Sequence, residues 1–193
     1  KSAAIVNAGD GLHEHPTQAL LDLLTIRQSL NKVKGLTLVM VGDAFRSRVA
    51  KSTIFMHKIL GNKVRVVAPP TLAVPYFEEL GVEVYYDMKK ALEGADIVMS
   101  LRMKHEYLKD TFVPNLDEYS RILEEVCPNA LVMAPGPMIR GVEIDSRVAD
   151  GMHSVITKQV TNGVAVRMAV LYLACFSKSW AKKEIDAQEV ISE

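Results

Sequence analysis

Short, almost wholly apolar runs alternate with helix-like segments along most of this sequence, and this alternation constrains the fold more than any other feature. The predicted strands are residues 36–41, 64–68, 82–86, 96–101 and 130–133. Apolar residues recur at helical spacing in 16–31, 48–60, 72–80, 88–92, 116–126 and 155–176. Strands that are apolar on both faces need cover on both faces. The pattern therefore predicts an α/β fold, a parallel sheet of about five strands with helices on each side.

The composition is typical of one globular domain without a charge bias. Of 193 residues, 49% are hydrophobic, and 23 Lys and Arg balance 23 Asp and Glu, so no electrostatic preference for nucleic acid or an acidic membrane is expected. Cys127 and Cys175 have no metal-type spacing, which favours a reduced, cytoplasmic protein. The apolar run 164–176 contains Arg167 and is too short to span a bilayer.

The N-terminus is abrupt. The chain begins without Met, and the apolar residues 3–6 resemble the end of a strand or a connector. We therefore expect the sequence to be a segment of a longer chain.

The segment 7–18 concentrates an acid, two imidazoles and an amide directly before a helical pattern. Its glycines allow a tight turn, and Pro16 suits the first turn of the following helix. These features predict a reaction-site loop. An ordinary surface loop with exposed His13 and His15 is the alternative that the segment alone leaves open.

Three further polar clusters, 42–48, 102–105 and 134–137, each follow a predicted strand. The carboxyl ends of parallel strands meet at one edge, where ligands bind near the reversal of strand order. Arginine directly after a buried strand suits a carboxylate or phosphate partner. Several such clusters together predict a site that orients a small polyanionic substrate around a polarised carbonyl.

Other site classes lack their motifs. The loop after 36–41 has no G-x-G-x-x-G, and the chain has neither G-x-x-x-x-G-K-[ST] nor G-x-S-x-G. The five histidines do not fall at metal-ligand spacing. We expect no cofactor and no metal.

The remaining motifs resemble those of the aspartate carbamoyltransferase family, over about residues 6–173 and in the family's order. They read N-A-G-D-G with H-P-T-Q, V-G-D with S-R-V-A, L-R-M-K, P-G-P with R-G-V-E-I, and Q-V-T-N-G. H-P-T-Q alone also fits the wider superfamily, including ornithine carbamoyltransferases. The G-D-G before it and the two separate arginines favour aspartate as the acceptor.

The resemblance implies a role for each matching residue. His15 would hydrogen-bond the carbamoyl oxygen as it gains charge, and Gln18 with the carbonyls of Pro135 and Gly136 would hold the carbamoyl NH₂.

Arg48 and Arg102 are similar to the family's clamp on the two aspartate carboxylates. Lys104 stands where the family usually has Gln, and would meet a carboxylate as a point charge. Ala134 replaces a histidine that helps to fix the loop.

The resemblance also implies what this chain lacks. The family's Ser-Thr-Arg-Thr-Arg loop, which cradles carbamoyl phosphate, is not in the sequence, so the chain alone should be inactive. We expect residues 1–176 to form the aspartate-binding domain, beginning at the inter-domain connector, and 177–193 a polar tail. The expected partners are L-aspartate, carbamoyl phosphate, an N-terminal domain that covers the apolar C-terminal helix, a homotrimer of complete chains and other subunits of the pyrimidine pathway.

Two alternatives stay open. Ala134, Lys104 and the expected absence of the first domain also suit a non-catalytic homologue that serves as a binding or assembly module. Transfer to another amine acceptor is the third reading, because the superfamily varies its acceptor pocket.

Overall fold

Helices and strands alternate along the chain as the apolar pattern predicts. The computed structural model describes residues 3–69, 76–102 and 116–191, and their side chains as far as 176 except at 116–119. The elements are α1 (Pro16–Leu30), β1 (Thr37–Val41), α2 (Arg48–Ile59), β2 (Lys63–Val67), α3 (Tyr76–Glu79), β3 (Glu83–Tyr85), α4 (Met88–Leu92), β4 (Ile97–Ser100), α5 (Leu116–Val126), β5 (Leu131–Met133), α6 (Ser146–Ala149) and α7 (Ile156–Ile191).

All five strands are parallel and lie in the order β3-β2-β1-β4-β5. Met40 of β1 pairs with Val66 on one side and with Met99 on the other. The chain builds the sheet outward from β1 in one direction and then, from β4, in the other. The predicted α/β fold is confirmed, and the reversal of strand order falls between β1 and β4.

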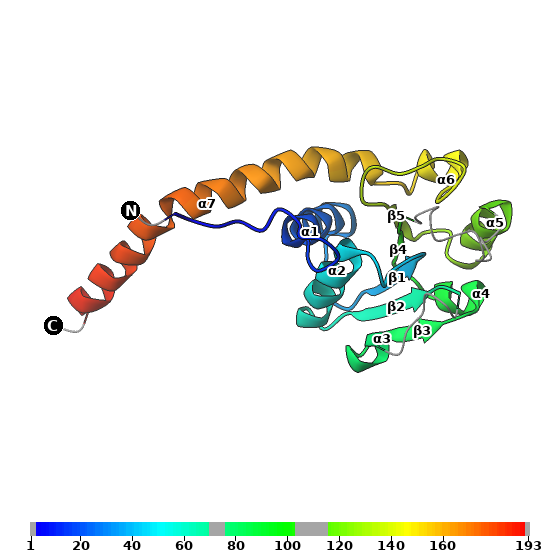
Figure 1. Ribbon diagram of the computed structural model, residues 1–193, viewed down its shortest axis with the longest axis horizontal. Coiled ribbons are helices and arrows are strands. Elements are labelled where there is room, and N and C mark those ends of the chain that lie inside the picture. The colour runs from blue at the N-terminus through cyan, green and yellow to red at the C-terminus, as the bar shows by residue number, and fades with distance from the viewer. Residues whose placement is uncertain (1–2, 70–75, 103–115, 192–193) are drawn as a thin grey trace.

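Successive residues of each strand enter two separate cores. Leu38 and Met40 pack in the core that α1 and α2 cover, whereas Val39 and Val41 pack in the core that α4, α5 and α6 cover. In Figure 1 these two groups of helices lie on opposite sides of the sheet. Because both faces are covered by helices, a polar site on this sheet is expected at the strand ends and in the loops that follow them.

Gly42 closes the end of β1 against β4. Its φ of 115° lies in the region that favours glycine, and a Cβ there would stand 2.8 Å from the carbonyl oxygen of Leu101. Any larger residue would push apart the two chain segments that leave β1 and β4. The glycine thus brings these two loops together at the strand-order reversal.

A polar seam joins α1 to the first turns of α7. Asp22 Oδ1 accepts hydrogen bonds from Gln18 Nε2 at 2.9 Å and from Gln159 Nε2 at 2.8 Å. One turn further along, Asn162 Nδ2 donates to Thr25 Oγ1 at 2.9 Å and to Gln28 Oε1 at 3.0 Å. Asp22, Gln159 and Asn162 are all buried. The seam fixes the two helices relative to each other through side chains that are 134 or more residues apart.

Beyond the seam, α7 leaves the body of the molecule, and both ends of the described chain lie on that side (Figure 1). We define the α7 apolar face by four side chains spaced three or four residues apart and each more than half exposed, Val160, Val164, Met168 and Leu171. Within the described residues, 156–176 is long and apolar enough to cross a membrane by length and composition alone. Because its first turns carry the polar seam, we interpret α7 instead as a helix that packs against protein.

Two details differ from the sequence-based expectations. Helix α7 continues to Ile191 instead of ending near Phe176, because residues 164–193 contain neither Gly nor Pro. The short α6 was not predicted. Residues 3–7 form no strand, in keeping with the connector that the sequence offered as an alternative. Of the predicted helix 72–80, residues 76–80 are described, and Tyr76–Glu79 are helical.

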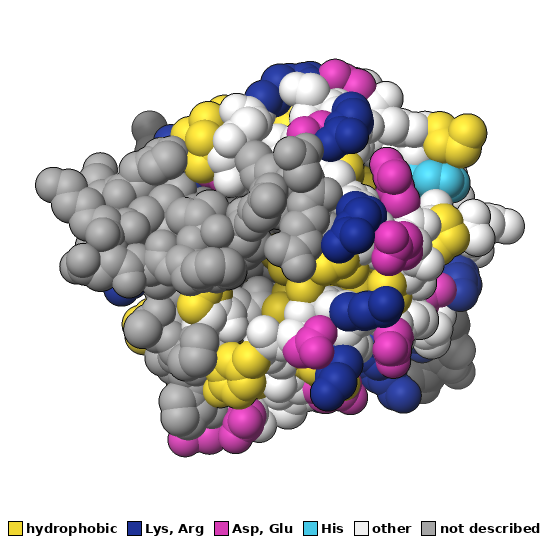
Figure 2. All heavy atoms as spheres, turned by 90° about the vertical axis from the view of Figure 1, so that its right-hand side faces the viewer, with side chains coloured by type: hydrophobic (Ala, Val, Ile, Leu, Met, Phe, Trp, Pro, Cys, Tyr) yellow, Lys and Arg dark blue, Asp and Glu magenta, His cyan; other side chains and the backbone are white. Residues whose placement is uncertain are grey.

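Charges of both signs alternate on the side of the molecule that carries α5 and α6, as Figure 2 shows. Around α6, Arg140 binds both carboxylate oxygens of Asp150, and Arg147 binds Asp145. The described side chains in this view form no large area of a single sign.

Asp22 makes the stability of the fold depend on pH. Burial raises the pKa of its carboxyl from 3.8 to about 7. Between about pH 4 and pH 7 the folded chain therefore holds a proton that the unfolded chain releases, so stability falls as pH rises through this window. Asp22→Asn keeps an oxygen acceptor and removes the charge. Relative to the parent chain, the variant should gain on the order of 4 kcal/mol between pH 4 and pH 8, measured by urea unfolding.

Asp150→Asn is the opposite control. The hydrogen bond from Arg140 lowers the pKa of this exposed carboxyl, so its variant should lose stability, relative to the parent chain, as pH rises toward about 4, and the difference should stay constant above that pH. Parallel pH profiles for Asp22→Asn and the parent chain would contradict the assignment of the raised pKa to Asp22.

Candidate functional site

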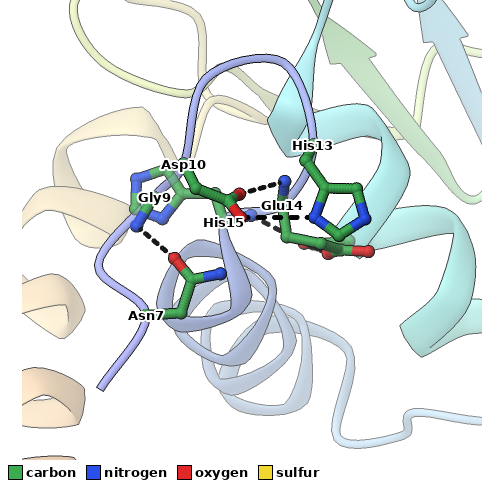
Figure 3. Close-up of polar contacts among 7 residues, drawn as sticks. Asn7, Gly9, Asp10, His13, Glu14 and His15 are labelled. Atoms are coloured by element: carbon green, nitrogen blue, oxygen red, sulfur yellow. Dashed lines mark hydrogen bonds and ion pairs between the residues drawn. The ribbon is translucent and has the colours of Figure 1, made fainter. Parts of the chain in front are cut away.

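The segment before α1 is a turn held by Asp10. Its Oδ1 accepts from the backbone N–H of Glu14 at 2.7 Å, and its Oδ2 lies 3.2 Å from His13 Nδ1. Figure 3 shows the imidazole rings of His13 and His15 on opposite sides of this turn. His13 is 76% exposed, so we interpret it as part of the turn's outer surface.

His15 stands at the N-terminus of α1 and is half-buried. Its backbone N–H donates to Ser52 Oγ of α2 at 2.8 Å, and Ser52 Oγ in turn donates to the carboxylate of Glu14. Burial lowers the pKa of the imidazole, and the charges of Arg48 and Arg167 lower it further. His15 is therefore neutral at pH 7, so one ring nitrogen carries an N–H that can donate to a substrate oxygen.

Arg48, the first residue of α2, lies against the turn before α1. Ser47 caps this helix, because its Oγ accepts from the backbone N–H of Ala50 at 3.2 Å. A Cβ on Gly9, which has a φ of 120°, would stand 2.9 Å from Arg48 Cζ. The glycine thus leaves room for the guanidinium beside the segment that carries His15.

Gln18 and the loop after β5 are joined through the polar seam. Gln18 Nε2 donates to Asp22, which leaves the Gln18 Oε1 as the acceptor end of the amide. Gln159 donates its Nε2 to the same Asp22 oxygen and accepts with Oε1 from the backbone N–H of Ala134 at 3.0 Å. Ala134 directly precedes Pro135 and Gly136. The start of this loop is therefore held by Gln159, although Ala134 has no side chain to fix it.

Arg102 follows β4 at the carboxyl edge of the sheet and is 54% exposed. Its Nε lies 3.9 Å from Oε1 of Glu143, a carboxylate oxygen that is buried and has no hydrogen-bond partner in the described part of the chain. The other oxygen of Glu143 accepts from the backbone N–H of Ile139 at 2.8 Å. Glu143 thus orients Arg102 while leaving most of its donors available. Lys104 lies outside the described residues.

Each described candidate residue therefore stands at the carboxyl edge or at the start of α1. His15 and Arg48 meet through the turn before α1, and Gln18 and the loop 135–136 meet through the seam. Arg102 comes from the other side of the strand-order reversal. Neutral donors and arginines are the groups that stabilise developing negative charge on a substrate without proton transfer. No group of three or more potential metal ligands exists among the described side chains.

Three residues of this arrangement were not predicted from the sequence. Asp22 and Gln159 hold the predicted residues in place, and Glu143 stands beside Arg102. For Asp22 the available signal was an acidic residue on the otherwise apolar side of a helix, and for Gln159 and Glu143 it was their place in the Q-V-T-N-G and R-G-V-E-I motifs.

Two family models match the chain. Residues 34–174 match the Asp/Orn binding domain of the aspartate/ornithine carbamoyltransferases, and residues 1–28 match the carbamoyl-P binding domain of the same proteins. The boundary between the matches falls near the end of α1. The α1–α7 seam thus joins a helix of one matched domain to a helix that begins in the other.

Relatives and solved structures agree with this match. The aspartate carbamoyltransferase catalytic subunit of Rhodopseudomonas palustris is 56% identical over 175 residues, which are 87% of this chain and 55% of the relative. That of Moorella thermoacetica is 51% identical over 178 residues, 89% of this chain and 58% of the relative. The chain thus spans about half the length of the curated relatives it matches.

A crystal structure of aspartate transcarbamoylase from Trypanosoma cruzi with aspartate and phosphate has a TM-score of 0.69 at 28% identity, covering 86% of this chain and 55% of the other. Ornithine carbamoyltransferase from Gloeobacter violaceus has a TM-score of 0.67 at 29% identity, and the match covers 82% of this chain and 58% of the other. From the match over residues 34–174 and these relatives, the chain belongs to the aspartate/ornithine carbamoyltransferase family.

Proposed function

We propose that this chain supplies the aspartate-binding half of an aspartate carbamoyltransferase. In that reaction the aspartate amine attacks the carbonyl carbon of carbamoyl phosphate, and the bond from this carbon to the phosphate oxygen breaks. Phosphate leaves, the amine loses a proton, and N-carbamoyl-aspartate is the product. The reaction is an early step of pyrimidine synthesis.

The observation that carries the proposal is the neutral His15 beside Arg48, at the carboxyl edge of a sheet whose relatives are catalytic subunits of this enzyme. A neutral imidazole N–H suits the carbamoyl oxygen, which gains negative charge as the amine attacks. Related T. cruzi structures contain aspartate with phosphate, carbamoyl phosphate, and N-(phosphonacetyl)-L-aspartic acid. These ligands support the same substrate pair for this chain.

The carbamoyl NH₂ would be held by three oxygen acceptors. Gln18 offers Oε1, because its Nε2 is already bound to Asp22, and Pro135 and Gly136 offer backbone carbonyls. Acceptors for the NH₂ and a donor for the carbonyl oxygen would fix the plane of the carbamoyl group.

Two arginines suit an acceptor with two carboxylates. Arg48 and Arg102 come from opposite sides of the strand-order reversal, and each guanidinium can bind a carboxylate with two N–H groups. Fold similarity does not select the acceptor, since aspartate and ornithine enzymes have similar TM-scores. The identities of 51–56% to aspartate enzymes favour aspartate over ornithine.

A non-catalytic homologue is the second candidate, and Ala134 and Lys104 are the residues that favour it. The hydrogen bond from Ala134 N–H to Gln159 weakens this candidate, because it holds the loop start without the family's histidine. A turnover assay with the protein as its gene encodes it separates the two candidates.

His15→Ala tests the proposed chemistry. In the protein as its gene encodes it, the variant should lower kcat for carbamoyl transfer by on the order of 10²–10³-fold, because it removes the donor to the carbonyl oxygen. Parent activity should also fall as pH drops through the lowered pKa of His15, where the ring becomes charged. Formation of N-carbamoyl-aspartate at saturating substrates is the measurement. His13→Ala is the matched control and should keep parent kcat; an equal loss in both variants would contradict the assignment.

Arg48→Ala and Arg102→Ala test the aspartate clamp. Each should lower kcat/KM for aspartate, and the loss of transition-state stabilisation obtained from that ratio should be about 2–4 kcal/mol, because a charge-assisted donor to a carboxylate is lost. The KM for carbamoyl phosphate should change far less. Arg27→Ala, on the exposed last turn of α1, is the control that should leave both constants unchanged. A larger change in the KM for carbamoyl phosphate than in the KM for aspartate would contradict the assignment of these arginines to aspartate.

The α7 apolar face tests the proposed assembly. We propose that the family's carbamoyl-phosphate domain covers this face in a complete chain, and that complete chains form a homotrimer. The 193 residues alone should then associate through the exposed face and show no carbamoyl transfer. Sedimentation should show less association after Met168→Glu with Leu171→Glu than after Ile59→Glu, an exposed apolar site on α2. A monomeric, active 193-residue chain would contradict the proposal.

A further inference from the structure

The acceptors proposed for the carbamoyl NH₂ come from two places in the fold that share no direct hydrogen bond in the described structure. Gln18 is on α1, and the carbonyls of 135–136 follow β5. The connection between them runs from Gln18 Nε2 to Asp22 Oδ1, from Gln159 Nε2 to the same oxygen, and from Ala134 N–H to Gln159 Oε1. The three bonds are 2.9, 2.8 and 3.0 Å long. Each donor and acceptor in this chain of bonds belongs to a buried residue.

The carboxylate sets the direction of every bond in the chain. Asp22 Oδ1 is the acceptor in both bonds, so both amide side chains turn their NH₂ groups toward it. Gln18 then presents its oxygen away from Asp22, where a substrate NH₂ can donate to it. Gln159 likewise presents its oxygen to the Ala134 N–H.

Stability alone does not account for a carboxyl at this position. Its second oxygen, Oδ2, is buried and has no hydrogen-bond partner in the described part of the chain. Burying such an oxygen costs free energy. The raised pKa of Asp22 is a separate sign of the same cost. A neighbouring positive charge, Arg167 of α7, offsets part of it.

We propose that Asp22 and Gln159 are positioning residues that hold Gln18 and the loop 135–136 in one arrangement around the carbamoyl group. The proposal rests on the proposed function. Neither residue would touch the aspartate, because Arg48 begins α2 and Arg102 follows β4, outside this chain of bonds. Loss of the hydrogen bonds that link Gln18 to Ala134 should therefore let the carbamoyl group take several orientations, while aspartate binding stays intact.

Gln159→Leu and Asp22→Leu break the connection at two points. In the protein as its gene encodes it, each should lower kcat by on the order of 10–100-fold, the effect of a small displacement of a reacting group. The KM for aspartate should stay within about twofold, since the clamp is untouched. Asp22→Asn keeps an oxygen acceptor for the two amides and should retain kcat within about threefold of the parent. Asp22→Leu removes that acceptor without adding a charge, so it should not retain the parent kcat.

Asn162→Leu is the matched control. It removes two hydrogen bonds of the same α1–α7 seam, one turn away, but Asn162 has no bond to the loop after β5 among the described contacts. Thermal unfolding of all four variants separates stability from positioning. Asn162→Leu should lower the unfolding midpoint as Gln159→Leu does, while its kcat stays at the parent value.

The outcomes distinguish the two proposals. A drop in kcat for Gln159→Leu and Asp22→Leu, with parent kcat for Asn162→Leu, supports the positioning role. Parent kcat in folded Gln159→Leu, or an equal drop in Asn162→Leu, overturns it while leaving the proposed function standing. A parent protein without carbamoyl transfer overturns both. If Asp22→Leu does not fold, Gln159→Leu and Asn162→Leu alone decide.

Discussion

Covering both faces of a parallel sheet is the constraint from which the rest of this structure follows. Alternate residues of strands β1 and β4 pack in two separate apolar cores. Functional polar side chains are therefore not expected on these two strands. Parallel strands also place all their carboxyl ends at one edge, and the strand order reverses there between β1 and β4. The arginines that follow these two strands therefore approach one region from opposite sides. Gly42 keeps that approach close.

The seam between α1 and α7 adds what the sheet cannot provide. An apolar helix contact would tolerate small shifts along the helix axes, whereas paired donors and acceptors such as Asp22 with Gln159 and Asn162 with Thr25 are satisfied in only one register. The seam thus fixes the helix that carries His15 and Gln18 relative to the sheet. The same α7 then continues outward with the α7 apolar face exposed, so one helix connects the site to the surface expected to meet another domain.

The sequence allowed most of the fold to be predicted, and part of the site. Helices α4 and α5 have the predicted bounds, because their apolar spacing is local and Asp87 caps α4. The four-residue α6 is too short to show a period. Arg48 was predicted because it follows a buried strand, and His15 because an acid, two imidazoles and an amide stand directly before a helical pattern. Asp22 and Gln159 were not found as a pair, because they are 137 residues apart and only the packing of α1 on α7 brings them together.

Burial has opposite consequences for the pKa of His15, which directly precedes α1, and of Asp22, which lies within it. It lowers the pKa of His15 and raises that of Asp22. The lowered pKa favours a neutral imidazole that offers a donor, so among the described candidate residues the arginines carry the positive charge. In the proposed reaction, a charged His15 would compete with Arg48 and Arg102 for the acceptor's carboxylates. A neutral one would keep its N–H for the carbonyl oxygen, where negative charge develops as the amine attacks.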